Sequence, residues 1–241
     1  MWNGKMKSLT FSYDDGVTQD RRLVEIFNKY GLKATFNINS ELLGGSNSLI
    51  RDGVEIRHDK IAVEEVASLY RGHEVAAHTL THPSLKKLND DSEIIRQVEE
   101  DRKNLSALVG YDVVGFAYPG GGKNYDSRIA QLIRQNTGVK YCRGTVSTHS
   151  FDRQENLYEF NPTVYHHVEM DKMFELGKQF LDLSPSTPQC FYIFGHAYEF
   201  DIRDEWGRFE EFCRMMSGRD DIFYGTNKEI LLDLAGSEGY N

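Results

Sequence analysis

The stretch Leu9-Thr10-Phe11-Ser12-Tyr13-Asp14-Asp15-Gly16 decides how the rest of the chain is interpreted. Its β-branched and aromatic residues predict a strand. The strand stops at two adjacent carboxylates and a glycine, which adopts backbone angles closed to other residues. Neighbouring carboxylates repel, so a fold that places them together supplies a cation or lets one of them hold a proton. Taken alone, the tripeptide Asp-Asp-Gly also fits a solvated turn, and the other motifs must decide between the two interpretations.

The chain beyond this strand alternates between helical and extended patterns. A helix is expected between a cap at Thr18 or Asp20 and a stop at Gly31, and a hairpin is expected around residues 51–54. Further helices are expected at 62–70, 91–109, 126–136, 170–182, 205–217 and 227–235, and further strands at 33–38, 74–77, 113–117, 139–143, 163–165, 190–194 and 222–224. This alternation indicates an α/β fold with a parallel sheet covered by helices, either closed as a barrel or open.

Composition narrows the function classes. The 241 residues are 39% hydrophobic, and we expect one α/β domain over residues 1–241 with its main motifs between 9 and 200. The formal charge of −9, with no long basic run, argues against a nucleic-acid partner. No segment reaches the roughly 18 apolar residues that span a bilayer, and residues 1–7 lack a secretory core, so we expect a cytoplasmic protein with no membrane partner. Three widely spaced cysteines are expected to be reduced and packed: Cys142, Cys190 and Cys213.

The second informative cluster is His78-Thr79-Leu80-Thr81-His82, which separates two imidazoles by four residues. On one helical turn this spacing places both rings on the same side, within reach of one ion. Pro83 limits the helical conformation to a single turn. Two surface histidines also occur at this spacing by chance. Together with a carboxylate from the strand end, the pair becomes an Asp-His-His set with open positions for water and substrate, as hydrolytic zinc sites require.

Two other clusters also follow predicted strands. Tyr118-Pro119-Gly120-Gly121-Gly122 forces a loop after the strand at 113–117, and Phe194-Gly195-His196 follows a strand that is too apolar to face water. His196 alone fits a satisfied core histidine, whereas beside a metal and a spare carboxylate it fits a proton donor. Every unusual polar cluster thus falls at the C-terminal end of a strand, which is where barrel enzymes place their chemistry.

The ordered motifs 10–16, 78–82, 116–121 and 194–196 resemble those of the polysaccharide deacetylases, also called NodB-homology enzymes or carbohydrate esterase family 4. The resemblance extends from about residue 5 to residue 200. It implies a distorted (β/α) barrel and metal-dependent hydrolysis of N-acetyl groups on an amino-sugar oligosaccharide or polysaccharide. One divalent ion is implied, zinc first, with cobalt, nickel or manganese as alternatives.

Roles follow from the resemblance by position. Asp14 would be the general base and His196 the general acid, with the metal held by Asp15, His78 and His82. The main-chain N–H of Gly120 would bind the oxyanion, in a substrate loop that also contains Tyr118 and Pro119.

Three departures from the family pattern affect these roles. Ala117 stands where members commonly have an arginine that orients the base; we predict that Arg143 replaces it, the alternative being a solvent-facing arginine. Phe194 replaces a leucine and should tighten the acetyl pocket. The fourth motif of the family is not evident, and its candidates are the pairs Phe151-Asp152 and His166-His167.

A few interpretations stay open at this point. Glu199, Asp201 and Trp206 could line a sugar site, although a solvated loop is favoured for the two acids. No role is assigned to His58, His73 or His149. The alternatives to sugar deacetylation are hydrolysis of another C–N bond, in a cyclic imide or small amide, and a non-catalytic carbohydrate-binding relative. Glycan length and linkage and the oligomeric state are not predicted.

Overall fold

The computed structural model describes residues 1–122 and 124–236, and strand β1 (Lys7–Asp14) is the centre of its fold. Every residue of β1 is buried. One edge of β1 pairs along its whole length with β9 (Gln189–His196). The other edge is shared by β10 (Ile222–Tyr224) along its first part and β2 (Ala34–Ile38) along its second part. Such sharing means that the sheet cannot be a regular barrel.

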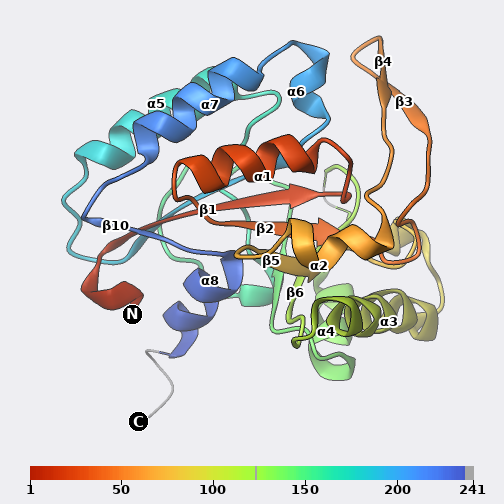
Figure 1. The fold of residues 1–241 in the computed structure, drawn as a ribbon. Coiled ribbons are helices and arrows are strands. Elements are labelled where there is room, and N and C mark those ends of the chain that lie inside the picture. Colours follow the sequence, from red (N-terminus) through yellow and green to blue (C-terminus); the bar gives the residue numbers. More distant parts are fainter. Residues whose placement is uncertain (123, 237–241) are drawn as a thin grey trace.

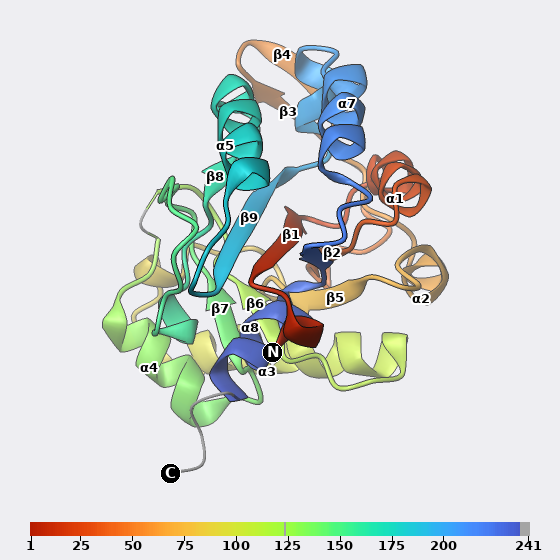
Figure 2. The same ribbon diagram turned by 90° about the vertical axis from the view of Figure 1, so that its left-hand side faces the viewer.

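The main sheet contains eight parallel strands. Seven form a continuous path in the order β7-β6-β5-β2-β1-β9-β8, and β10 adds to β1. The sheet curls like part of a barrel, and helices surround it (Figure 2). Within the described ranges its two end strands, β7 and β8, are not paired with each other. The predicted distorted (β/α) barrel is therefore confirmed. The remaining strands of the path are β5 (Glu74–Ala77), β6 (Gly115–Ala117), β7 (Tyr141–Arg143) and β8 (Val164–Tyr165).

The helices pack apolar faces against this sheet. Helix α1 runs alongside β1, and α5 and α7 run side by side (Figure 1). Helix α3 shows how the sequence sets its ends: the Asp90 side chain accepts a hydrogen bond from the Ser92 N–H at 2.9 Å, and Gly110 ends the helix with φ of 76°. The longer helices are α1 (Asp20–Lys29), α3 (Asp91–Val109), α4 (Ser127–Asn136), α5 (Met170–Asp182), α7 (Trp206–Met216) and α8 (Asn227–Gly236).

Some elements differ from the prediction. The helix expected at 62–70 is a 3-10 turn, Val63–Glu65, followed by a short helix, α2 (Val66–Leu69). A short helix after β9, α6 (Glu199–Ile202), was not predicted. The expected hairpin is confirmed as β3 (Ser48–Arg51) and β4 (Val54–Arg57). It stands apart from the main sheet at the end where β1 and β2 terminate (Figure 1).

The structure also bears on the state of the cysteines and on membrane-spanning segments. Cys142, Cys190 and Cys213 are buried and free, as predicted. No helix within residues 1–122 and 124–236 is long and apolar enough to cross a membrane.

The parallel arrangement fixes where the site lies. Because parallel strands end at the same edge of a sheet, the residues at their C-terminal ends converge. Asp14 is the last residue of β1, Arg143 the last of β7 and His196 the last of β9, and His78 follows β5 directly.

Candidate metal centre and active site

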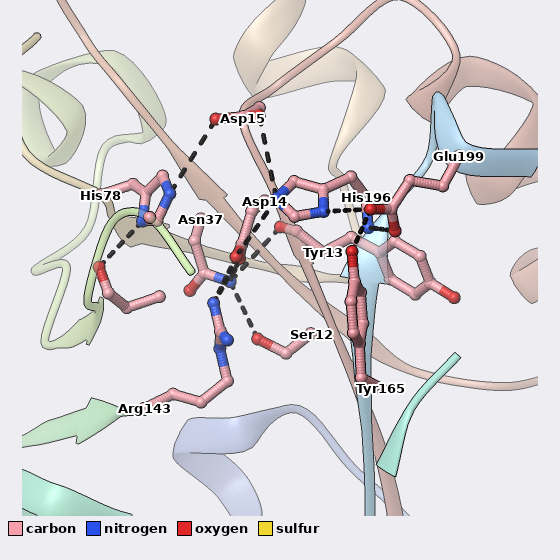
Figure 3. A network of polar contacts seen from close by, with 12 residues as sticks. Ser12, Tyr13, Asp14, Asp15, Asn37, His78, Arg143, Tyr165, His196 and Glu199 are labelled. Carbon is pink, nitrogen blue, oxygen red and sulfur yellow. Dashed lines mark hydrogen bonds and ion pairs between the residues drawn. The ribbon is translucent and has the colours of Figure 1, made fainter. Parts of the chain in front are cut away.

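Asp14 is held from two sides by polar side chains of neighbouring strands. The Nη2 of Arg143 donates to its two carboxylate oxygens at 2.6 and 2.5 Å, and the Nδ2 of Asn37 donates to Oδ1 at 2.8 Å. Arg143 is completely buried and Asp14 is 3% exposed. The alternative of a solvent-facing Arg143 is therefore wrong. The guanidinium contacts both carboxylate oxygens of Asp14 (Figure 3), and that Arg143 replaces the arginine absent at Ala117 stays a prediction.

Asp15, His78 and His82 bring three potential ligand atoms within 4.8 Å of one another. The Oδ1 of Asp15 lies 3.9 Å from the Nε2 of His78 and 3.7 Å from the Nε2 of His82. The Nδ1 of His78 lies 2.8 Å from the Ala117 carbonyl oxygen and must donate its proton to it, because a carbonyl only accepts. The lone pair of the ring is therefore on Nε2. Among the described residues, this buried Nε2 atom has no hydrogen-bond partner. Burial lowers the pKa of His78 to about 4 and also lowers that of His82, so both rings are neutral and able to bind a cation. These features fit a divalent metal ion.

The backbone between the two histidines is not the helical turn that the spacing suggested. Thr79 and His82 have φ of 71° and 58°, which lie in the left-handed region, and no helix is assigned to 78–82. The side-chain amide of Asn39 donates to the carbonyls of His78 and Thr79 at 2.7 and 2.9 Å. An irregular loop thus replaces the helical turn, and it still places the ring centroids of His78 and His82 5.0 Å apart.

Two residues that were not predicted surround Asp15. The Nε2 of His58 lies 3.0 Å from Oδ2, and the Nζ of Lys60 donates to the main-chain carbonyl of Asp15 at 2.8 Å. Burial alone would raise the pKa of Asp15, but the hydrogen bond from His58 and the charge of Lys60 hold it well below its usual range. Both residues come from the connection between β2 and α2, so no local pattern around Asp15 indicates them.

His196 lies across the site from the two imidazoles. Its Nε2 is 4.0 Å from carboxylate oxygens of both Asp14 and Asp15, and its Nδ1 is 3.0 Å from the Oε1 of Glu199 (Figure 3). Burial would lower the pKa of His196, but the negative charges of Glu199, Asp15 and Asp14 raise it to about 9. The ring is therefore protonated at neutral pH and able to donate.

Glu199 is completely buried behind His196, so its interpretation as a sugar-lining or solvated acid was wrong. Its carboxylate accepts from the Tyr165 hydroxyl, and lies 3.1 Å from the Nη2 of Arg51 and 3.2 Å from the Nε2 of His166. Burial would raise the pKa of Glu199, but the charge of His196 and the contact with His166 hold it well below its usual range. Gly195 makes room for this arrangement, since a Cβ there would lie 1.8 Å from the His166 ring.

The other predicted sugar or fourth-motif residues lie away from the ligands. Trp206 is 3% exposed and donates its indole N–H to Asp201 at 2.7 Å, so the expectation that it lines a sugar site was wrong. Phe151 is partly buried and packs against the core, and Asp152 is exposed. His167 is buried and pairs with an acid at the tip of the β3–β4 hairpin.

A cavity of about 520 Å³ opens above Asp14 and Asp15. One wall comes from the β2–α2 connection and another from the loops after β6 and β7, the last residue of β8, and the end of β9 with the residues after it. Besides the two aspartates, the residues that line it include Leu42, Asn47, Leu49, Arg51, His58, Lys60, His82, Gly120, Thr145, Tyr165, Phe194, His196 and Tyr198.

The predicted substrate loop contributes unevenly to this cavity. Gly120 lines it, with φ of 84°. Tyr118 and Pro119 are buried, and neither is among the lining residues. The Tyr118 ring stacks on Tyr125 at 3.9 Å, and its hydroxyl donates to the Tyr158 carbonyl at 2.9 Å. The Tyr118 side chain thus packs beneath the loop and does not line the cavity.

A family model described as "Polysaccharide deacetylase" matches residues 3–141 of the sequence, which is more than half of the chain. The chain belongs to the polysaccharide deacetylase family. The match includes Asp14, Asp15, His78 and His82. Arg143 and His196 lie beyond it, so their placement in a polysaccharide deacetylase site rests on the geometry given above.

Comparison with solved structures agrees with the polysaccharide deacetylase fold. The chain is similar to a family 4 carbohydrate esterase from Streptomyces lividans in complex with acetate (14% identity, TM-score 0.55, 92% of each chain covered). It is also similar to Bc1960, a peptidoglycan N-acetylglucosamine deacetylase (16% identity, TM-score 0.57, 95% of this chain and 89% of that chain). A third similar protein is a family 4 pseudoenzyme from Bacillus anthracis (15% identity, TM-score 0.51, 94% of this chain and 66% of that chain). A search of curated protein sequences finds no match.

Proposed function

We propose that this protein removes N-acetyl groups from an amino-sugar oligosaccharide or polysaccharide with the help of one divalent cation. The observation that carries the proposal is the convergence of three units at one cavity: the Asp14–Arg143 pair, the Asp15-His78-His82 set and His196. A base, a cation site and an acid are the three groups that metal-dependent amide hydrolysis uses.

Asp15, His78 and His82 would hold the cation, and two neutral imidazoles with one carboxylate are typical of a catalytic zinc site. Bound there, the cation would polarise the acetyl carbonyl and make a water molecule more acidic. Cobalt, nickel and manganese are the alternative ions for the same ligand set.

Asp14 acts as the general base in this scheme. It takes a proton from the attacking water while the water oxygen forms a bond to the acetyl carbon. Arg143 and Asn37 fix both of its oxygens, so the carboxylate needs no reorganisation to accept the proton. The main-chain N–H of Gly120, on the cavity wall, is proposed to donate to the carbonyl oxygen as negative charge develops on it.

His196 completes the reaction as the general acid. Its Nδ1 side is occupied by Glu199, so Nε2 is the atom that faces the two aspartates and the cavity. A proton from Nε2 reaches the sugar nitrogen as the C–N bond breaks, and the products are acetate and a free amine. The partly buried Tyr165 ring on the cavity wall is proposed to pack against a sugar ring, and Phe194, which is 3% exposed, is proposed to tighten the acetyl pocket.

Acetate release tests this function. Purified protein is incubated with N-acetylchitooligosaccharides as isolated, after chelation, and after zinc is added back. We expect acetate and free amine in equal amounts, lost on chelation and restored by zinc. Release of ammonia or a ring-opened product from cyclic imides, without acetate from any N-acetyl sugar, would contradict the proposal, as would a protein that binds the sugars and leaves them intact.

A further inference from the structure

We propose that His58 is a positioning residue for the metal ligand Asp15, and that it fixes which carboxylate oxygen faces the cation. This inference rests on the metal centre of the proposed function and extends it to the connection between β2 and α2. His58 comes directly after β4, and it lies 43 residues from Asp15 in the chain.

The contacts divide the two oxygens of Asp15 between different tasks. Oδ2 lies 3.0 Å from the Nε2 of His58. Oδ1 lies on the side of the imidazoles, 3.9 Å from His78 and 3.7 Å from His82. With Oδ2 engaged by a ring N–H, the carboxylate presents one oxygen to the cation and its rotation about the Cβ–Cγ bond is stopped.

His58 itself does not belong to the ligand set. Among the described residues, the group whose ligand atoms all lie within 4.8 Å contains Asp15, His78 and His82 and excludes His58. Its nearest acceptor is the carboxylate oxygen that points away from the other two imidazoles. A histidine in this place acts through Asp15 and not on the ion.

Three contacts besides the one with Asp15 fix His58, as a positioning residue requires. Its Nδ1 lies 3.1 Å from the Oδ1 of Asn47, and its main-chain N–H donates to the Asn47 carbonyl at 2.8 Å. The Tyr198 ring packs edge-on against it at 5.0 Å between centroids. The side chain is 12% exposed, so water does not compete freely for Nε2.

Lys60 completes the same support by holding the main chain of Asp15. Its Nζ donates to the Asp15 carbonyl at 2.8 Å, and the Asp15 N–H donates to the Asn37 carbonyl at 2.9 Å. Asp15 has φ of 83°, a strained conformation for a residue with a side chain, which persists because surrounding contacts maintain it. Lys60 therefore fixes the backbone of the ligand and also lies 3.6 Å from Oδ1, whereas His58 holds Oδ2.

Metal affinity tests the inference, since it needs no substrate. Zinc dissociation constants are measured by competition with a chromophoric chelator for the wild type, His58→Ala, His58→Gln and, as a matched control, His149→Ala, which removes a surface histidine that pairs with Glu169. We expect His58→Ala to weaken zinc binding by about 10- to 100-fold. A glutamine amide nitrogen reaches about as far from the backbone as Nε2 and donates in its place, so His58→Gln should recover most of the affinity, while His149→Ala binds as the wild type does.

Two further measurements separate a change at the metal site from a loss of folding. The visible absorption of bound Co²⁺ should change in His58→Ala and return toward the wild-type spectrum in His58→Gln. Circular dichroism in chelator checks that each metal-free variant is folded; if His58→Ala is not, His58→Leu, which keeps the packing against Tyr198, replaces it. The inference would be overturned if His58→Ala, or His58→Leu in its place, bound zinc as tightly as the wild type. It would also be overturned if that variant and His58→Gln lost zinc affinity equally. Failure to release acetate from any sugar would count against the proposed function alone.

Discussion

The Arg143 guanidinium reaches both carboxylate oxygens of Asp14, although the two residues are 129 positions apart and end strands that are not neighbours in the sheet. The guanidinium also lies over the Phe194 ring, 4.7 Å from its centroid, and donates to the Gly144 carbonyl. Both members of the pair are buried. Removing one member leaves the other charge without its partner, which is costly for stability.

Replacing Arg143 by methionine should therefore destabilise the fold as well as the site. We expect Arg143→Met to lower the free energy of unfolding by about 3–5 kcal/mol, measured by urea denaturation in chelator. The double variant with Asp14→Asn should lose less than the sum of the two single variants, because the second change removes the unpaired charge. Arg71→Met, at an exposed arginine, is the control. A loss of less than about 0.5 kcal/mol in Arg143→Met, which is typical of surface changes, would show that the pair is unimportant.

Substitution of the proposed base or acid should separate chemistry from metal binding. Asp14→Asn and His196→Ala are each expected to retain one zinc ion per chain by metal analysis, because neither belongs to the ligand set. Their kcat for acetate release should fall by about 10²- to 10⁴-fold. Full turnover in Asp14→Asn would remove this residue as the base, and full turnover in His196→Ala would remove it as the acid.

Glu199→Gln tests the charge behind His196. The negative charge of Glu199 is one cause of the His196 pKa near 9, so its removal should lower that pKa. A general acid works only when it is protonated, and activity is lost as pH rises through its pKa. The alkaline limb of the kcat/KM profile should thus move to lower pH by at least about one unit. An alkaline limb at an unchanged pH would mean that another group is the acid.

The buried Asp20 should make the free energy of unfolding depend on pH. Burial raises the pKa of Asp20 to about 8, although its Oδ2 accepts a hydrogen bond from the Tyr70 hydroxyl. Between about pH 4 and pH 8 the folded chain holds a proton that the unfolded chain has released, so this group makes the free energy of unfolding fall as pH rises. Asp20→Asn keeps an acceptor for Tyr70 and cannot ionise. Urea denaturation at pH 5 and pH 8 should show a smaller decrease for Asp20→Asn than for the wild type; equal decreases would contradict the assignment.

Much of the fold and the centre of the site could be predicted because they depend on local patterns. The strand ending at Asp14, the strand ending near His196 and the helix capped by Asp90 all show their structure within about ten residues of sequence. Parallel strands bring their ends to one edge, so the convergence of Asp14, Asp15 and His196 follows from the alternation of strands and helices. Arg143 also ends a strand of that sheet, but β7 and β1 are not neighbours, so its contact with Asp14 depends on the curl of the sheet and not on the alternation alone.

The rest depends on contacts that sequence spacing does not indicate. His58 and Lys60 reach Asp15 from an irregular connection more than 40 residues away. Glu199 stands in the stretch 197–202, in which two acids are separated by an aromatic residue, and its sequence gives no sign of the buried place that Gly195 and His166 leave for its carboxylate. The loop 78–82 takes left-handed conformations at Thr79 and His82 that residue type disfavours, and contacts with Asn39 stabilise it.

The most direct test is a crystal structure of the protein grown with zinc, with anomalous differences recorded at the zinc edge. We expect one strong peak per chain, bonded to the Oδ1 of Asp15 and to the Nε2 atoms of His78 and His82 at about 2.0–2.2 Å. A peak elsewhere, or no peak at saturating zinc with these three side chains well ordered, would contradict this expectation.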